Sequence, residues 1–280
     1  MFKTIKFELR ENGIGILTLN RPDKLNSISF QMIEELHKLL DYLLINLDCR
    51  VIIMKGAGRA FCSGADLKST SILLSKVKSE ESKKFFFLDV PEVIKSEMYY
   101  LWRISQITVK MRKISQPIIA VIHGYASGGG FTFSMAADIR IVSEDARFSC
   151  SFINIGFSSG DIGASYFLPR LIGMSRASEL MYTGRFMDAE EAISIGFAFK
   201  KVKQEKLLES ALNIANNILN TSPLGLRMTK EALNLSLDAP SLELLIQIEN
   251  RTQVICMTSK DVVEGVVAWK DKRNPKFPLK

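Results

Sequence analysis

Hydrophobic and polar positions alternate at the start of the chain, over residues 3–10 and 15–20, with Asn12–Gly13 between the two runs. A period of two is typical of a strand and Asn-Gly is a favoured turn, so this pattern predicts a β-hairpin. Over residues 33–44 the apolar positions recur at helical spacing instead, and Ser29 is a suitable N-cap. We therefore expect the hairpin to lead into an amphipathic helix.

Two continuous apolar runs, residues 51–54 and 117–122, predict buried strands, and each run enters a glycine-rich loop. The residues between them, 66–116, are predicted to be mostly helical. Shorter elements follow: helices near 131–137, 162–172, 175–183 and 188–195, and strands near 139–142 and 197–202.

The C-terminal part carries only helical patterns from residue 206, broken at Ser222–Pro223 and Ala239–Pro240. Strands alternating with helices, followed by helices alone, indicate an α/β fold with a helical appendage. We place the α/β core at residues 1–204 and the helical region at residues 205–280.

Composition narrows the class of protein. The chain has 280 residues and is 47% hydrophobic, which is enough for a sizeable core. It shows no signal-peptide pattern and no apolar run long enough to span a bilayer, so no membrane association is expected. Four scattered cysteines without a CxxC pair, and two isolated histidines, predict neither a disulfide framework nor a metal site. We expect a soluble, cytoplasmic protein.

The net charge of +7 suits a polyanionic ligand, either nucleic acid, a membrane surface or a phosphate-rich small molecule. A lysine-rich solvated surface explains the charge equally well. One hypothesis is RNA binding through the basic segment 270–276, but the sequence has no RNP-like pattern and no interleaved aromatic and basic residues. Nucleic-acid binding is therefore disfavoured.

The glycine-rich loops, residues 58–66 and 123–130, suggest where the chemistry lies. Glycines allow a ligand to approach backbone N–H groups, and the first N–H groups of a helix have no intrahelical partner. Two such loops facing each other can hold a developing oxyanion between two amides. Neither loop has the P-loop or GxGxxG pattern, and Ser127 is not in a GxSxG nucleophile elbow.

Four segments make a family resemblance specific: NRPDKLNS (residues 20–27), FCSGADL (61–67), PIIAVIHGYASGGG (117–130) and LPRLIGMSRASELMYTGR (168–185). In type and order they resemble the enoyl-CoA hydratase/isomerase (crotonase) superfamily. The resemblance implies a crotonase-like α/β spiral of ββα units with a C-terminal helical trimerisation region, in a homotrimer or homohexamer. It also implies an acyl-CoA thioester as substrate, with no separate cofactor because coenzyme A is part of that substrate.

The resemblance also assigns residues. The amides of Ala65 and Gly129 would form the oxyanion hole for the thioester carbonyl. Further residues would bind the CoA ester: Lys24, Leu25, Ser63, Gly64, Asp66, Lys68, Gly128, Thr132, Phe152, Trp269 and Lys272. Among these, Trp269 and Lys272 would cover the adenine end. Plain solvent exposure is the alternative for the three lysines, and a tight helix-entry turn is the alternative for Gly129.

Two substitutions depart from the hydratase pattern. Thr132 and Phe152 stand where typical hydratases carry their two catalytic glutamates. Neither side chain exchanges a proton near neutral pH, and each general acid or base is typically worth about 10²–10⁴-fold in rate. Ordinary hydration should therefore be badly impaired unless another group substitutes.

Asp161 is the carboxylate that follows closely in sequence, at a position where some CoA isomerases of the family carry an aspartate. It has two open roles, a proton shuttle with a raised pKa or a cap of the helix that follows. Dehalogenation is disfavoured because Ser105 stands where that branch needs a histidine, and His123 is expected to be structural. Glu92 and Glu97 are reserve acid/base candidates.

Two main hypotheses result. The first is enolate chemistry on an acyl-CoA, with double-bond isomerisation or a relocated hydration. The second is a non-catalytic acyl-CoA-binding homologue, because both usual glutamates are replaced.

Overall fold

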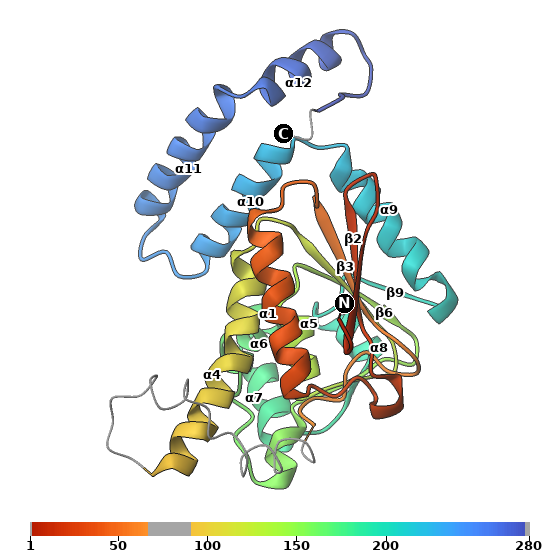
Figure 1. Ribbon diagram of the computed structural model, residues 1–280. Coiled ribbons are helices and arrows are strands. Elements are labelled where there is room, and N and C mark those ends of the chain that lie inside the picture. The colour runs from red at the N-terminus through yellow and green to blue at the C-terminus, as the bar shows by residue number, and fades with distance from the viewer. Residues whose placement is uncertain (1, 67–90, 278–280) are drawn as a thin grey trace.

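The computed structural model describes residues 2–66 and 91–277 (Figure 1). Its central feature is a six-stranded sheet in the order β1-β2-β3-β4-β6-β9. The strands are Ile5–Leu9, Ile14–Leu19, Val51–Gly56, Ile118–Ile122, Ile139–Ser143 and Lys200–Val202. The hairpin of β1 and β2 is antiparallel, and every later neighbour is parallel. The predicted hairpin and the two buried strands are thus confirmed.

Both faces of this sheet are buried, which explains the continuous apolar runs in its central strands. In β3, Ile52 and Met54 join the core beneath helices α1 (Phe30–Ile45) and α4 (Glu92–Lys113). Val51 and Ile53 point the other way, toward helix α9 (Leu207–Leu219). The helices α1 and α9 accordingly lie on opposite sides of the sheet (Figure 1). Ser29 caps α1 as predicted, its side chain accepting a 3.3 Å hydrogen bond from the amide of Met32.

A second, three-stranded sheet was not predicted. It consists of β5 (Tyr125–Ser127), β7 (Arg147–Ser149) and β8 (Met187–Asp188). Strands of two or three residues are too short to give a recognisable alternation. Its strand β5 lies directly before helix α5 (Gly129–Ala136), all eight residues of which are buried.

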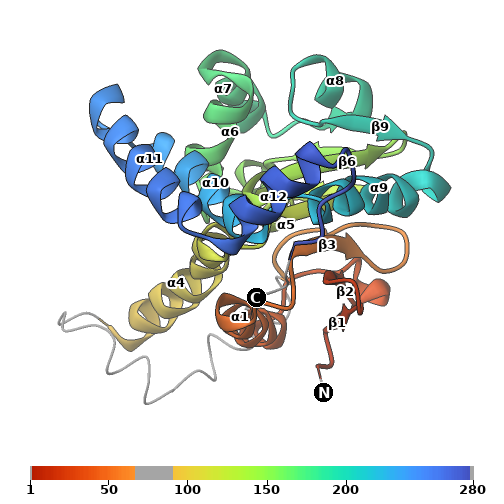
Figure 2. The ribbon, with the colours of Figure 1, turned by 90° about the horizontal axis from the view of Figure 1, so that it is seen from above.

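The remaining helices are α6 (Ala164–Ile172), α7 (Met174–Thr183), α8 (Ala189–Ser194), α10 (Pro223–Ser236), α11 (Leu242–Met257) and α12 (Lys260–Lys270), with short 3₁₀ turns at Pro22–Lys24, Ser151–Ile155 and Gln204–Lys206. Viewed from above, α6 and α7 lie apart from β1 and β2, with the other strands of the sheet between them (Figure 2). The predicted helix breaks near residues 222 and 239 are confirmed. The domain division at residue 205 stays a prediction. Helix α9 lies beyond this residue and packs on the sheet.

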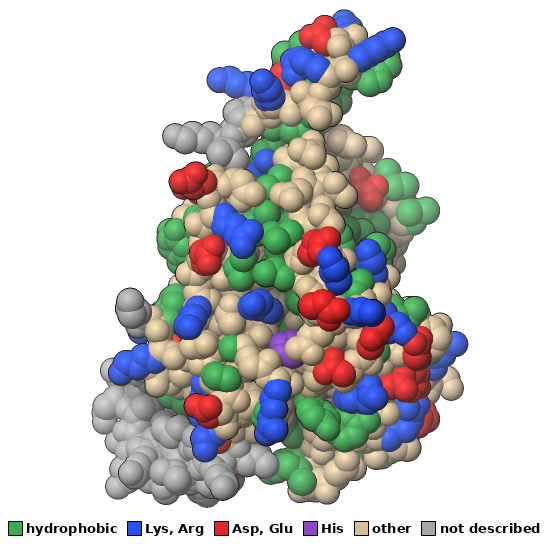
Figure 3. All heavy atoms as spheres, turned by 90° about the vertical axis from the view of Figure 1, so that its right-hand side faces the viewer, with side chains coloured by type: hydrophobic (Ala, Val, Ile, Leu, Met, Phe, Trp, Pro, Cys, Tyr) green, Lys and Arg blue, Asp and Glu red, His purple; other side chains and the backbone are tan. Residues whose placement is uncertain are grey.

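The two last helices, α11 and α12, project from the body of the molecule (Figures 1 and 2). We call them the C-terminal arm. No residue of α11 is buried, and Trp269 on α12 is 80% exposed. On the face drawn in Figure 3, basic side chains gather at the end of this arm, whereas acidic and basic side chains are interspersed over the body below. In the part of the chain that the structure describes, no helix combines the length and apolarity needed to cross a membrane.

A buried charge cluster joins α10 to the body. Lys230 is 5% exposed, and its Nζ lies 2.9 Å from the carboxylate of Asp138 and 2.7 Å from the carbonyl oxygen of Gln116. Arg112 on α4 binds the other carboxylate oxygen of Asp138 at 2.9 Å. Because the ammonium group compensates the polar groups around it, replacing it would leave a buried carboxylate and carbonyl underpaired.

The packing of α1 on α4 includes a buried histidine. His37 is 3% exposed, and its Nε2 lies 2.8 Å from the carbonyl oxygen of Arg103, so Nε2 carries the hydrogen. No described residue pairs with Nδ1. Burial lowers the pKa of His37, with the positive charges of Arg103 and Lys110 acting in the same direction and Glu34 opposing them.

We predict that this histidine makes the fold acid-sensitive. Below its usual pKa of 6.5 the unfolded chain takes up a proton that folded His37 resists. The free energy of unfolding should therefore fall by up to about 1.4 kcal/mol per pH unit until the folded pKa is reached. His37→Gln keeps a donor for the Arg103 carbonyl but does not titrate. Urea unfolding at pH 7.5 and 5.5 should show a smaller loss for this variant, and equal losses in both proteins would contradict the prediction.

Candidate active site

The two glycine-rich loops are joined by backbone hydrogen bonds. The Cys62 amide donates to the Tyr125 carbonyl and the Ser127 amide donates to the Cys62 carbonyl, both at 3.0 Å, so the first loop extends along β5. Glycine is required at Gly130, where an added Cβ would lie 2.1 Å from the Cys62 carbonyl oxygen. This close approach brings the ends of both loops together at the start of α5.

The amides of Ala65 and Gly129 lie at this junction. A Cβ added to Gly64 would lie 3.5 Å from the Gly129 nitrogen. Ala65 pairs with Ile28 through its neighbours, since the Ile28 amide donates to Gly64 and the Asp66 amide donates to Ile28. In such a parallel bridge the Ala65 N–H points away from Ile28.

Both amides are available as donors. Gly129 opens α5, so its N–H has no intrahelical acceptor and lies at the positive end of the helix dipole. Among the residues that the structure describes, none accepts a hydrogen bond from the amide of Ala65 or of Gly129. Two neighbouring unpaired amides can hydrogen-bond an oxygen that becomes negatively charged.

An ion pair holds the loop that carries Ala65. Arg21 binds the carboxylate of Asp66 at 2.7 Å, and both side chains are less than one-fifth exposed. The same guanidinium donates to the carbonyl oxygen of Ser27. Sequence reasoning placed Asp66 among the substrate-binding residues and did not single out Arg21, although Arg21 belongs to the NRPDKLNS segment. The structure gives both residues a role in fixing this loop.

The predicted CoA-binding residues that lie away from the amide junction occupy different parts of the chain. Leu25 lies beside the first loop, because its carbonyl accepts a 3.0 Å hydrogen bond from the Ser63 amide, and Lys24 next to it is exposed. Lys68 lies outside the described residues. Trp269 and Lys272 lie at the end of the C-terminal arm, far from the two loops of the same chain (Figure 1).

Thr132 and Phe152 both lie near the amide of Gly129 but offer no carboxylate. Thr132 is 2% exposed, and its hydroxyl donates to the Gly128 carbonyl of its own helix at 3.3 Å. Phe152 covers Gly128, where an added Cβ would lie 2.8 Å from its ring. Gly128 has φ 49° and ψ −121°, which only glycine adopts readily. Nothing in either contact supplies a proton donor or acceptor to a bound ester.

Asp161 is half-buried, and no cationic side chain among the described residues forms an ion pair with its carboxylate. Burial raises the pKa of its carboxyl group, although a 2.9 Å hydrogen bond from the Ile162 amide opposes the shift. The predicted start of the following helix at residue 162 was wrong, because α6 begins at Ala164 and its N-cap is Gly163. Asp161 therefore does not cap the first turn of α6, and its carboxylate instead accepts the hydrogen bond of the Ile162 amide in the turn before that helix.

The turn after Asp161 reaches the amide junction. The Cδ1 atom of Ile162 would lie 3.3 Å from a Cβ added to Gly129. The carboxylate thus stands one residue away from a side chain that contacts the start of α5. Glu97 is exposed on α4, and the side chain of Glu92 lies outside the described residues.

His123 is structural, as expected. It is 7% exposed, and its Nε2 lies 2.8 Å from the carbonyl oxygen of Gly58, which adds a side-chain link between the two loops. Within residues 2–66 and 91–277 no three His, Cys, Asp or Glu side chains are grouped as metal ligands would be.

The comparisons with known proteins agree with one another. The model of the enoyl-CoA hydratase/isomerase family matches residues 9–280. A Mycobacterium bovis protein named probable enoyl-CoA hydratase is 37% identical over 265 residues, covering 94% of this chain and 89% of that protein. The 1,2-epoxyphenylacetyl-CoA isomerase of Escherichia coli is 30% identical over 268 residues, covering 95% of each chain.

Among solved structures, the enoyl-CoA hydratase of Bacillus anthracis superposes with a TM-score of 0.87 at 32% identity, covering 99% of this chain and all of that one. The crotonase fold and the enzyme class predicted from the motifs, hydratase or isomerase, are confirmed at the level of the family. A match of one family model to almost the whole chain, relatives above 30% identity and a shared fold leave one assignment: this chain belongs to the enoyl-CoA hydratase/isomerase family, the crotonase superfamily.

Proposed function

We propose that this protein converts an acyl-CoA thioester through its enolate, with the amides of Ala65 and Gly129 binding the enolate oxygen and Asp161 moving the proton. One observation carries the proposal. Two unpaired amides lie at the junction of the two loops, and a half-buried carboxylate stands on the turn that contacts Gly129. Because the carboxylate has no cationic partner among the described residues, it is free to accept a proton.

The reaction that one carboxylate can perform is isomerisation. Ionised Asp161 removes a proton from the saturated carbon α to the thioester of a 3-enoyl ester, or from the γ carbon of a 2-enoyl ester, and the C–H electron pair passes into a dienolate whose oxygen accepts hydrogen bonds from the two amides. The same carboxyl group returns the proton to another carbon of the conjugated system. The double bond has then moved, water is neither consumed nor released, and Asp161 is ionised again.

Isomerisation fits the residues better than hydration does. Hydration needs one group to activate water and another to protonate carbon, and Thr132 and Phe152 supply neither. The names of the relatives include both a hydratase, at 37% identity, and an isomerase of an epoxide, at 30%, so the choice rests on the residues of this chain. The CoA part of the ester is proposed to pass Lys24, Leu25 and the first loop, and no separate cofactor is required.

A non-catalytic acyl-CoA-binding protein is the second candidate. The observation in its favour is the pair of replaced positions, where a hydroxyl bonded to its own helix and an aromatic ring stand in place of carboxylates. Such a protein would keep the two amides as a thioester-binding site. Tight binding of CoA esters without conversion of any of them would favour this candidate.

We further propose a homotrimer or homohexamer in which the C-terminal arm covers the CoA of a neighbouring subunit. Exposed apolar side chains are concentrated on the arm, among them Leu242, Val254, Met257, Val263 and Trp269. Contiguous apolar surface of this kind usually marks an association site. The distance of the arm from the loops of its own chain also favours a contribution to another subunit (Figure 1).

The first experiment incubates the protein with short, long and aromatic enoyl-CoA esters in D₂O and follows them by mass spectrometry. We expect deuterium uptake or double-bond migration without a gain of water. Addition of water to any ester would instead establish hydration with a relocated acid and base. Binding without any change would favour the non-catalytic candidate.

Asp161→Asn tests the proposed base. Asparagine keeps an oxygen acceptor for the Ile162 amide but cannot take up the proton, so turnover should fall by about 10²–10⁴-fold or more while the affinity for CoA esters stays unchanged. The exposed Asp48→Asn serves as the matched control and should behave as wild type. An active Asp161→Asn protein would remove this residue from the mechanism.

The pH dependence of turnover tests the same residue independently. The ionised carboxylate is the active form and its pKa is raised above the usual 3.8. Turnover should therefore decline as the pH falls through this raised pKa, and the acidic limb should be absent from the residual activity of Asp161→Asn. A limb that persists in the variant would assign it to another group.

Mixed oligomers test the proposed arrangement of subunits. Trp269→Ala/Lys272→Glu subunits should show a raised KM on their own. If the arm acts on a neighbour, co-expression with Asp161→Asn subunits should restore a low KM at some sites, because the intact arm and the intact Asp161 then meet across an interface. A KM that stays high in every mixture, or a monomer in light scattering, would contradict the proposal.

A further inference from the structure

The turn that carries Asp161 holds an unusual backbone conformation. Ile162 has φ 44°, in the left-handed region, and is 6% exposed. A β-branched residue is a genuine outlier there, since its side chain crowds the backbone. Such a conformation persists only where the surroundings over-determine it, and it clusters at functional sites. The contacts that hold Ile162 are therefore informative.

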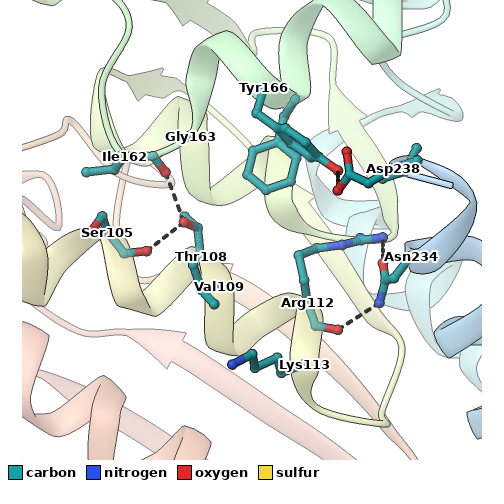
Figure 4. A pocket seen from close by; sticks show the side chains of 12 residues that line it. Ser105, Thr108, Val109, Arg112, Lys113, Ile162, Gly163, Tyr166, Asn234 and Asp238 are labelled. Atoms are coloured by element: carbon teal, nitrogen blue, oxygen red, sulfur yellow. Dashed lines mark hydrogen bonds between the residues drawn. The ribbon is translucent and has the colours of Figure 1, made fainter. Parts of the chain in front are cut away.

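Both backbone groups of Ile162 are held by side chains. Its amide donates to the carboxylate of Asp161 at 2.9 Å. Its carbonyl accepts a 2.9 Å hydrogen bond from the hydroxyl of Thr108, which lies on α4 and is 3% exposed (Figure 4). The two residues are 54 positions apart in the chain. This bond is a tertiary link between α4 and the turn before α6.

The link lies where a shift of the turn would affect the site. The side chain of Ile162 reaches Gly129, and Ile162 and Gly163 also line a surface groove of about 400 Å³ between α4, α6 and α10. Thr108 also lines this groove (Figure 4). The hydroxyl of Thr108 thus holds the backbone of the turn, while the side chain of Ile162 contacts the start of α5.

A purely local role does not account for the geometry. Threonine in a helix often bonds a carbonyl of the preceding turn, and the single hydroxyl proton of Thr108 is shared between the Ser105 carbonyl at 2.8 Å and the Ile162 carbonyl at 2.9 Å. The contact with Ser105 needs no tertiary partner. The second carbonyl, from Ile162, is buried and comes from a different element. Without the hydroxyl it would lose its only described side-chain donor, and the left-handed turn would lose its attachment to α4.

We propose that Thr108 is a positioning residue for proton transfer: its hydrogen bond to the Ile162 carbonyl fixes the turn that joins Asp161 to the side chain in contact with Gly129. The inference rests on the proposed role of Asp161. Thr108 touches neither substrate nor reacting atoms in this account, and it acts only through the turn. Its loss should therefore affect the rate of the chemical step more than the binding of the ester.

The test compares Thr108→Val, which exchanges the hydroxyl for a methyl group, with Thr108→Ser, which keeps the hydroxyl. Thr108→Val should lower kcat by up to about 100-fold, the size of effect that a misplacement of about 1 Å produces, and change KM less than twofold. Thr108→Ser should restore kcat. The matched control is Ser105→Ala on the same helix, whose hydroxyl has the Trp102 carbonyl as its one partner among the described residues, and it should behave as wild type.

A second readout does not depend on turnover. The pKa of the Asp161 carboxyl, measured by ¹³C NMR and assigned with Asp161→Asn, should fall in Thr108→Val because the released turn exposes the carboxylate to water. It should return to the wild-type value in Thr108→Ser. No cation lies within ion-pair distance of Asp161 among the described residues, so its pKa depends on burial, which raises it, and on the hydrogen bond from the Ile162 amide, which lowers it. Thr108→Ala removes the same hydroxyl with less steric demand and replaces Thr108→Val if the latter does not fold.

The outcomes separate this inference from the proposed function. An unchanged kcat and an unchanged Asp161 pKa in Thr108→Val or Thr108→Ala would overturn the inference, whatever Asp161 does. A lowered pKa in a protein whose Asp161→Asn variant stays active would keep the positional link and reject the catalytic role. A loss of kcat that Thr108→Ser does not restore would also overturn the inference, since the hydroxyl would not be the cause.

Discussion

The hydrogen-bonded pairing of Cys62 with β5 is the constraint on which the site depends. It joins two loops that leave the sheet after β3 and β4, and it leaves the amides of Ala65 and Gly129 side by side. A parallel sheet sets this up, because adjacent parallel strands end at the same edge and deliver their following loops to one place. Glycine at position 130 then permits contact between backbones that a single methyl group would prevent.

Most of the fold followed from pattern. The hairpin, the capped first helix, the two buried strands and the late helices gave periodic or punctuated signals, and these elements formed where expected. The small second sheet gave none, because its strands have two or three residues and are defined by partners distant in sequence. Burial on both faces of the central strands was readable as unbroken apolar runs, whereas pairing between loops is a tertiary event without a local period.

The site was predicted unevenly for a similar reason. Ala65, Gly129 and Asp161 stand in recognisable segments, so their positions could be proposed from the sequence alone. Thr108 stands in an ordinary amphipathic helix, and nothing local distinguishes its hydroxyl from any other on that helix. Its partner is the backbone carbonyl of Ile162, and a backbone atom cannot be recognised from the residue type. The predicted start of α6 at residue 162 was wrong because Ile162 has a left-handed backbone, which is not helical. The helix begins two residues later, at Ala164.

The packing around Thr132 and Phe152 bears on how the chain can change in evolution. A glutamate at position 132 would bring a charge into a place that is 2% exposed, and such burial costs several kcal/mol unless the charge is compensated. A glutamate at position 152 would remove the ring that covers Gly128 and leave its space unfilled. Each substitution would therefore be unfavourable alone, and neither by itself would give the acid and base pair that hydration uses.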